Sequence, residues 1–212
     1  MPFKPNEREY RAMPVLSIAG EKRIDSDFYV EGYATTFNDP YVLYEFDGNK
    51  YYEVIDRHAL DDADMADVIM QYDHSGRVRA RNSNGTLGLE PDHTGLFIFA
   101  DLSKSSAAKE LYEDIESGLV TKMSWAFTVE DDEYDRNTRT RTIKKIRKVY
   151  DVSAVSIPAN NGTDISARSF FDGVIEKEKR EAQEQEEQKR VAEKKKKKMR
   201  LEIKLKLNGG NQ

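Results

Sequence analysis

Residues 122–132, KMSWAFTVEDD, carry the alternation that best indicates how this chain folds. Every second position holds a bulky side chain: Met123, Trp125, Phe127 and Val129. Successive side chains of a strand point to opposite faces, so the segment predicts a strand with one bulky face and one uncrowded face. Ser124 lies on the uncrowded face.

The surrounding segments extend this strand into a sheet. Residues 143–157 are rich in β-formers and end at Pro158, which cannot donate to a strand ladder. Further strands are predicted at residues 27–34, 51–56, 68–72, 86–89 and 96–102, the last two as a hairpin. One helix is predicted at residues 107–115, with serines before it and Gly118 after it as caps. The pattern indicates an α+β fold, with a mainly antiparallel sheet or barrel and a few flanking helices.

Composition divides the 212 residues into three parts. From about Gly173 the sequence EKEKREAQEQEEQKRVAEKKKKKMR contains almost no apolar residue and cannot form a core. We therefore expect an N-terminal extension at residues 1–22, a folded domain at 23–172 and a charged tail, helical or disordered, at 173–212. Within that tail, residues 201–207 alternate leucine or isoleucine with charge, which predicts an amphipathic strand.

Several classes of protein are disfavoured. The absence of cysteine excludes disulfides, thiolate zinc sites and a cysteine nucleophile. No apolar segment approaches the length of a signal peptide or membrane span, and the net charge of -5 argues against general nucleic-acid binding. The sequence lacks HExxH, GxxxxGK[ST] and GxGxxG, so neither a metal nor a nucleotide cofactor is expected. The acidic group Asp61, Asp62, Asp64 and Asp67 is interpreted as a solvated surface.

Catalysis near neutral pH would draw its base from three histidines. His58 and His93 lie in polar segments typical of exposed loops. His74 follows the apolar run VIMQY, where a strand meets a loop, and its ring could reach a surface cleft. It could then activate the hydroxyl of Ser124.

A serine and a histidine act together best when a third group orients the imidazole. Asp151 lies in the apolar run KVYDVSAVSIPA, where a buried carboxylate is costly unless it is hydrogen-bonded. An exposed aspartate on an edge strand fits the same pattern equally well. Asp73 is the rival orienter, although neighbouring residues of a strand point to opposite faces and Asp73 is next to His74.

Five motifs follow one another along residues 28–169. They are VEGYATTFN at 30–38, YDHS at 72–75, LGLEPDHTGLFIFADL at 87–102, ELYEDIESGLVTKMSWAF at 110–127, and VYDVSAVSIPANNGT at 149–163. Taken in this order, they resemble the prohead protease family of tailed phages, whose fold is similar to that of the herpesvirus assemblins. Ala126 departs from the pattern, since family members often carry glycine after the position of Trp125.

The resemblance implies a serine endopeptidase without a cofactor, with His74 as base, Ser124 as nucleophile and Asp151 as third member. It also implies residence in the procapsid, in the cytoplasm of a bacterial host. There the enzyme would cleave the major capsid protein, the scaffolding protein and itself, with self-association as a further expectation. A noncatalytic capsid assembly or scaffolding protein is the main alternative, and a β-rich binding module with a disordered tail is the third.

Overall fold

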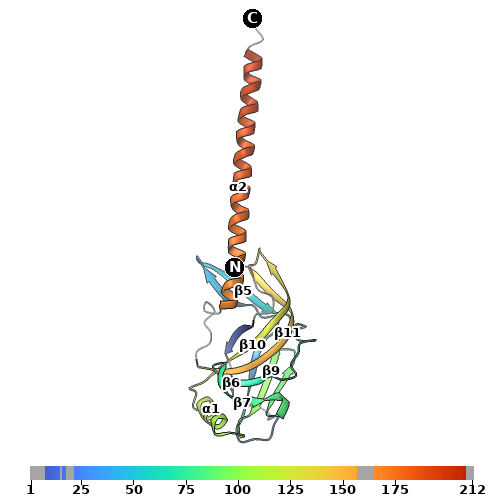
Figure 1. Cartoon of the computed structure of the whole chain (residues 1–212), viewed down its shortest axis with the longest axis vertical. Coiled ribbons are helices and arrows are strands. Elements are labelled where there is room, and N and C mark those ends of the chain that lie inside the picture. The colour runs from blue at the N-terminus through green and yellow to red at the C-terminus, as the bar shows by residue number, and fades with distance from the viewer. Residues whose placement is uncertain (1–7, 15, 18–21, 157–164, 209–212) are drawn as a thin grey trace. The chain divides into compact units, whose positions relative to one another are not determined.

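The computed structural model describes residues 8–14, 16–17, 22–156 and 165–208 (Figure 1). The chain divides into two compact units, and the break falls between Ser169 and Phe170. The first unit holds two β-sheets and a short helix, and the second consists largely of one long helix.

The larger sheet has seven strands. They are β1 (Glu9–Pro14), β4 (Tyr41–Phe46), β5 (Asn49–Ile55), β6 (Ile69–Tyr72), β7 (Ser75–Arg81), β10 (Lys122–Asp135) and β11 (Thr140–Val155). The smaller sheet contains β2 (Leu16–Ser17), β3 (Tyr29–Thr36), β8 (Leu87–Pro91) and β9 (Gly95–Asp101). A 3-10 turn, η1 (Asn82–Asn84), follows β7.

The α+β prediction is confirmed, with mostly antiparallel pairing. The main path of the larger sheet is β1-β10-β11-β5-β4, while β6 pairs with β11 and β7 pairs with β6. Strand β11 pairs in parallel with both β5 and β6, so the sheet is mixed. Within the described residues the two sheets stay open, so the barrel alternative is wrong; the likeness to the assemblin fold stays a prediction.

Strand β10 has the two faces that its sequence predicts. Trp125 and Phe127 are fully buried in the hydrophobic core, which also includes residues of the smaller sheet such as Val30 and Ile98. Burying such aromatic side chains is among the largest stabilising contributions in a domain. The small residues between them form the second face, which carries Ser124.

Strand β1, inside the segment predicted as an N-terminal extension, is an edge strand of the larger sheet. It pairs with β10 so that Ala12 lies opposite Ser124. Arg11 is buried and binds Glu53, with its Nε 2.5 Å from Oε1, and its Nη2 lies 2.5 Å from Glu9 Oε2. Arg141 closes the group, with its Nη1 2.7 Å from Glu9 Oε2.

These four residues, Glu9, Arg11, Glu53 and Arg141, form a buried ion cluster. Burial alone would lower the pKa of Arg11, but Glu53 and Glu9 raise it well above its usual value. For Glu9 the directions are reversed: burial alone would raise its pKa, but the charges of Arg11 and Arg141 lower it. Removing one member would leave an uncompensated buried charge, so the cluster ties β1 firmly to the sheet.

The predicted helix is confirmed as α1 (Ser106–Glu116), with both caps. The Ser105 hydroxyl accepts a hydrogen bond from the Ala108 amide at 3.1 Å, and Gly118 adopts φ 75°, the left-handed conformation that ends many helices. Strands β1, β2, β4 and β7 were not predicted: β2 has only two residues, β1 and β7 are rich in charge, and β4 lacks a regular apolar alternation.

Helix α2 (Ile165–Asn208) has 44 residues and makes up the described part of the second unit from Phe170 onward. Residues 182–200 are all exposed, in keeping with their charge. The prediction of a strand at residues 201–207 is wrong, because these residues are helical; leucine, lysine and glutamate favour helix, and an isolated strand has no pairing partner. None of the helices that the structure describes combines the length and apolarity needed to cross a membrane.

Candidate active site

A tight hairpin positions His74. Strands β6 and β7 pair with Tyr72 opposite Ser75, which leaves Asp73 and His74 as a two-residue turn. Both turn residues have positive φ, 46° and 53°, as tight hairpin turns require. Aspartate and histidine are among the non-glycine residues that tolerate this conformation best, so the sequence fits the turn that presents the imidazole.

The turn is held to the end of β11. Asp73 donates its amide to the Ala154 carbonyl at 3.0 Å, and its carboxylate accepts from the Ser156 amide at 3.0 Å and the Ser156 hydroxyl at 2.9 Å. The carboxylate of Asp73, the rival orienter, is therefore bound to Ser156 and anchors the turn.

A β-bulge places Asp151 on the same face as Ser124. In the pairing of β10 with β11, Phe127 lies opposite Val149 and Ala126 opposite Asp151, so Tyr150 is an extra residue. Val149 faces the core, and strict alternation would have put Asp151 there as well. The bulge shifts the alternation by one residue and turns the carboxylate toward the uncrowded face.

The three side chains meet on that face in a continuous relay. His74 Nε2 lies 2.6 Å from the Ser124 hydroxyl, and His74 Nδ1 lies 2.5 Å from Asp151 Oδ1. Ser124 and Asp151 are 1% and 4% exposed, while the His74 side chain is 19% exposed. A neutral imidazole in this setting can donate from Nδ1 to the carboxylate and accept the hydroxyl proton at Nε2.

A second hydroxyl supports the carboxylate. Ser153, which lies directly opposite Ser124 in the ladder and is fully buried, donates to Asp151 Oδ1 at 2.7 Å. The same oxygen binds His74, so the Ser153 hydrogen bond fixes its position. Sequence analysis did not single out Ser153, although its spacing of two residues from Asp151 puts both on one strand face.

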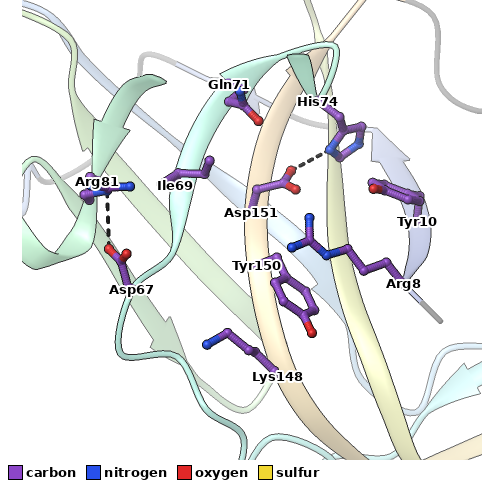
Figure 2. Close-up of a pocket in the computed structure, with 10 residues that line it drawn as sticks. All are labelled: Arg8, Tyr10, Asp67, Ile69, Gln71, His74, Arg81, Lys148, Tyr150 and Asp151. Atoms are coloured by element: carbon purple, nitrogen blue, oxygen red, sulfur yellow. Dashed lines mark hydrogen bonds and ion pairs between the residues drawn. The ribbon is translucent and has the colours of Figure 1, made fainter. Parts of the chain in front are cut away.

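An aromatic ring and a pocket border the histidine (Figure 2). The Tyr10 ring from β1 packs edge-on against His74, with centroids 4.8 Å apart. Beside them lies a pocket of about 350 Å³, lined by Arg8, Tyr10, Asp67, Ile69, Gln71, His74, Arg81, Lys148, Tyr150 and Asp151. The segment predicted as an extension thus contributes Arg8 and Tyr10 to the surroundings of His74.

The other two histidines lie away from this site, whereas the exposed acidic group reaches it through Asp67, which lines the pocket. His58 is exposed and binds Asp61, with its Nδ1 2.9 Å from Oδ2. His93 is exposed in the β8–β9 loop. In the acidic group, Asp64 binds Lys148 at 2.7 Å and Asp62 lies 3.4 Å from Lys145 Nζ. Within the described residues, no three histidine or carboxylate side chains gather as metal ligands would.

Comparison with known proteins identifies related chains. The sequence pattern of the family described as caudovirus prohead serine protease matches residues 18–178. The prohead protease of Enterobacteria phage HK97 is 31% identical over 87 residues, which cover 41% of this chain and 39% of that protein's length. The solved structure of the bacteriophage T4 capsid assembly protease covers 72% of this chain and 100% of its own, at 13% identity and a TM-score of 0.45, a likeness too weak to support an argument.

The family match begins before strand β3, ends within helix α2 and includes all three residues of the relay. It spans well over half of the chain. The chain therefore belongs to the family of caudovirus prohead serine proteases.

Proposed function

We propose that this protein is a serine endopeptidase in which Ser124 is the nucleophile, His74 the general base and Asp151 the orienting carboxylate. The observation that carries the proposal is the relay of 2.6 Å from Ser124 to His74 and 2.5 Å from His74 to Asp151. A serine hydroxyl is a weak nucleophile until a base takes its proton, and this geometry supplies the base.

The reaction would proceed in two halves. His74 Nε2 takes the hydroxyl proton as Ser124 Oγ attacks the peptide carbonyl, and the carboxylate of Asp151 stabilises the resulting imidazolium. His74 then gives the proton to the leaving amine. The amine departs, and the acyl group remains bound to Ser124 as an ester. A water molecule, deprotonated by His74 in the same way, hydrolyses the ester and restores the free serine.

We propose the capsid and scaffolding proteins of the same phage as substrates, together with the protease itself, cleaved inside the procapsid in the host cytoplasm. Family membership supports this assignment, and the relative from phage HK97 carries the name prohead protease. Enclosure with the substrates would confine cleavage to assembled heads.

Coexpression with the capsid and scaffolding proteins tests the proposal, with fragments identified by mass spectrometry. We expect cleavage by the wild type and by His58→Ala, a matched histidine variant outside the site, and none by Ser124→Ala or His74→Ala. Cleavage by all variants would refute the assigned residues. Intact substrates in every sample, including the wild type, would favour the noncatalytic assembly protein.

We also propose that the protease domain and the charged tail have different roles. The protease domain comprises residues 23–172 together with strand β1, whose pairing beside Ser124 makes it part of the same sheet. The tail at 173–212, whose residues 182–200 are all exposed, contacts the scaffold. Deletion of the residues after Gly173 should reduce incorporation into heads and leave peptide cleavage intact; unchanged incorporation would contradict this role.

A further inference from the structure

Strand β7 carries a row of arginines that the relay does not use. Its sequence, SGRVRAR, places arginine at positions 77, 79 and 81. These three residues are defined here as the arginine row by their order along β7. The pairing of β7 with β6 is irregular between Ala80 and Ser75. Arg77 is exposed, and Arg79 and Arg81 are half-buried.

Arg81, at the end of the arginine row, lies on the same face of the sheet as the relay. Asp151 pairs with Ile69 of β6, and Ile69 pairs in turn with Arg81 of β7. Directly paired residues point to the same side, so Asp151, Ile69 and Arg81 follow one another across the face. Figure 2 shows this succession from Asp151 past Ile69 to Arg81.

Two hollows flank the row and share Arg81. One is the pocket beside His74, and the other has a volume of about 310 Å³. Its lining residues are Val78, Arg79, Ala80, Arg81, Asn84, Thr86, Lys104 and Ser105. Three of these are cationic, and this described lining contains no carboxylate, so the hollow favours an anion.

Neighbouring charge neutralises part of the row and leaves the rest available. Arg81 Nε lies 3.3 Å from Asp67 Oδ1, and Lys104 pairs with Asp101 outside the hollow at 3.1 Å. Arg77 and Arg79 make no ion pair within the described part of the chain, and Arg79 Nε is buried without a hydrogen-bond acceptor. A buried arginine nitrogen that lacks an acceptor is costly, so Arg79 keeps donor capacity that an added acceptor could use.

The outer side of β7 is an edge of the larger sheet. Among the described strands β7 pairs with β6 alone, and helix α1 lies near part of it. At Arg81 the edge is closed by Thr86, whose hydroxyl accepts from the Arg81 amide at 2.8 Å and whose amide donates to the Arg81 carbonyl at 3.2 Å. The free edge is therefore the part of β7 that precedes Arg81.

We propose that this edge docks an extended acidic segment of a substrate protein, which adds to β7 as a further strand. The main chain of the segment would pair with β7, and carboxylates at alternate positions would face Arg77 and Arg79. Strand addition supplies main-chain hydrogen bonds, and arginine binds carboxylates through paired donors. Only the identification of the bound segment as substrate rests on the proposed protease function.

Binding can be measured without cleavage, on full-length protein carrying Ser124→Ala. The probe is a short fluorescent peptide of alternating glutamate and serine, followed by anisotropy, with the glutamine counterpart as reference. We expect the glutamate peptide to bind more tightly by about tenfold or more, and to weaken as salt rises from ~0.1 M to ~1 M. N-methylation of alternate peptide amides should abolish binding, since it removes the donors of an added strand.

Charge reversal locates the surface. Arg77→Glu with Arg79→Glu should weaken the glutamate peptide at least about tenfold, whereas the matched pair Lys50→Glu with Lys144→Glu should leave it unchanged. Thermal unfolding checks that the variants fold. If the Arg77→Glu, Arg79→Glu variant does not fold, the Arg77→Gln, Arg79→Gln variant is measured in its place by the same binding assay. Equal binding of the two peptides, or no effect of either arginine pair, would overturn the proposal and leave the arginines as protection against edge aggregation. Because binding is independent of Ser124, a failure here and a failure of the catalytic proposal are distinguishable.

Discussion

The substitution Asp151→Asn tests the third member of the relay most directly. Asp151 Oδ1 accepts from both His74 Nδ1, at 2.5 Å, and Ser153 Oγ, at 2.7 Å. An asparagine can place its carbonyl oxygen at the same point and keep both hydrogen bonds. The change therefore removes chiefly the negative charge that stabilises the imidazolium during attack.

The size of the effect follows from the separation of the charges. Two unit charges about 4 Å apart attract by about 4 kcal/mol at an effective dielectric constant of ~20, a value suited to a partly exposed histidine. Loss of that stabilisation slows the reaction by roughly 10³-fold. We expect the rate of acylation to fall by about that factor, with little change in substrate binding.

A fluorophosphonate, which phosphonylates activated serines with loss of fluoride, reports this activation of Ser124 without a known cleavage sequence. The matched control is Asp62→Asn, an exposed aspartate 3.4 Å from Lys145 Nζ, which should label as the wild type does. Thermal unfolding establishes that Asp151→Asn remains folded. Labelling of Asp151→Asn at close to the wild-type rate would refute the assignment, and a large loss in Asp73→Asn instead would identify the rival carboxylate.

Three further outcomes follow from individual contacts. Ser153→Ala should slow fluorophosphonate labelling by about 10-fold or more, because a hydrogen bond to a charged group contributes about 1.5–3 kcal/mol; an unchanged rate would limit Ser153 to packing. Glu53→Gln should lower the free energy of unfolding in urea by about 3–5 kcal/mol, since it leaves the buried Arg11 and Arg141 to share the buried carboxylate of Glu9, and an unaltered midpoint would contradict this. Burial alone would raise the pKa of Asp101, but hydrogen bonds from Ser26 and Ser103 lower it to about 2. A carboxylate whose pKa is lowered by folding stabilises the fold at pH values above its unfolded pKa. The free energy of unfolding should therefore fall by about 2 kcal/mol as pH falls from about 4 to about 2. Urea titrations of Asp101→Asn should lack this loss.

The sequence determined the local elements because their signals repeat within a few residues. The alternation in residues 122–132 predicted β10, and the serines and Gly118 predicted the limits of α1. Composition also marked a charged tail from about Gly173, close to the break between the compact units after Ser169. With three histidines and no cysteine in the chain, the candidates for a base and nucleophile were few.

The tertiary structure decided which of these residues meet. His74 and Ser124 are 50 positions apart, and their contact depends on a hairpin turn held at the end of β11. The face of Asp151 depends on one extra residue in the ladder, Tyr150, which the alternation of the sequence does not reveal.

The position of the first strand was likewise a matter of long-range contacts. Glu9 and Arg141 are 132 positions apart, and neither sequence neighbourhood predicts that they share a buried ion cluster. Periodicity reports which side of an element is apolar, whereas pairing partners and bulges depend on surfaces from distant parts of the chain. For that reason the sequence could name candidates for the relay, and only the folded sheet could bring His74, Ser124 and Asp151 together.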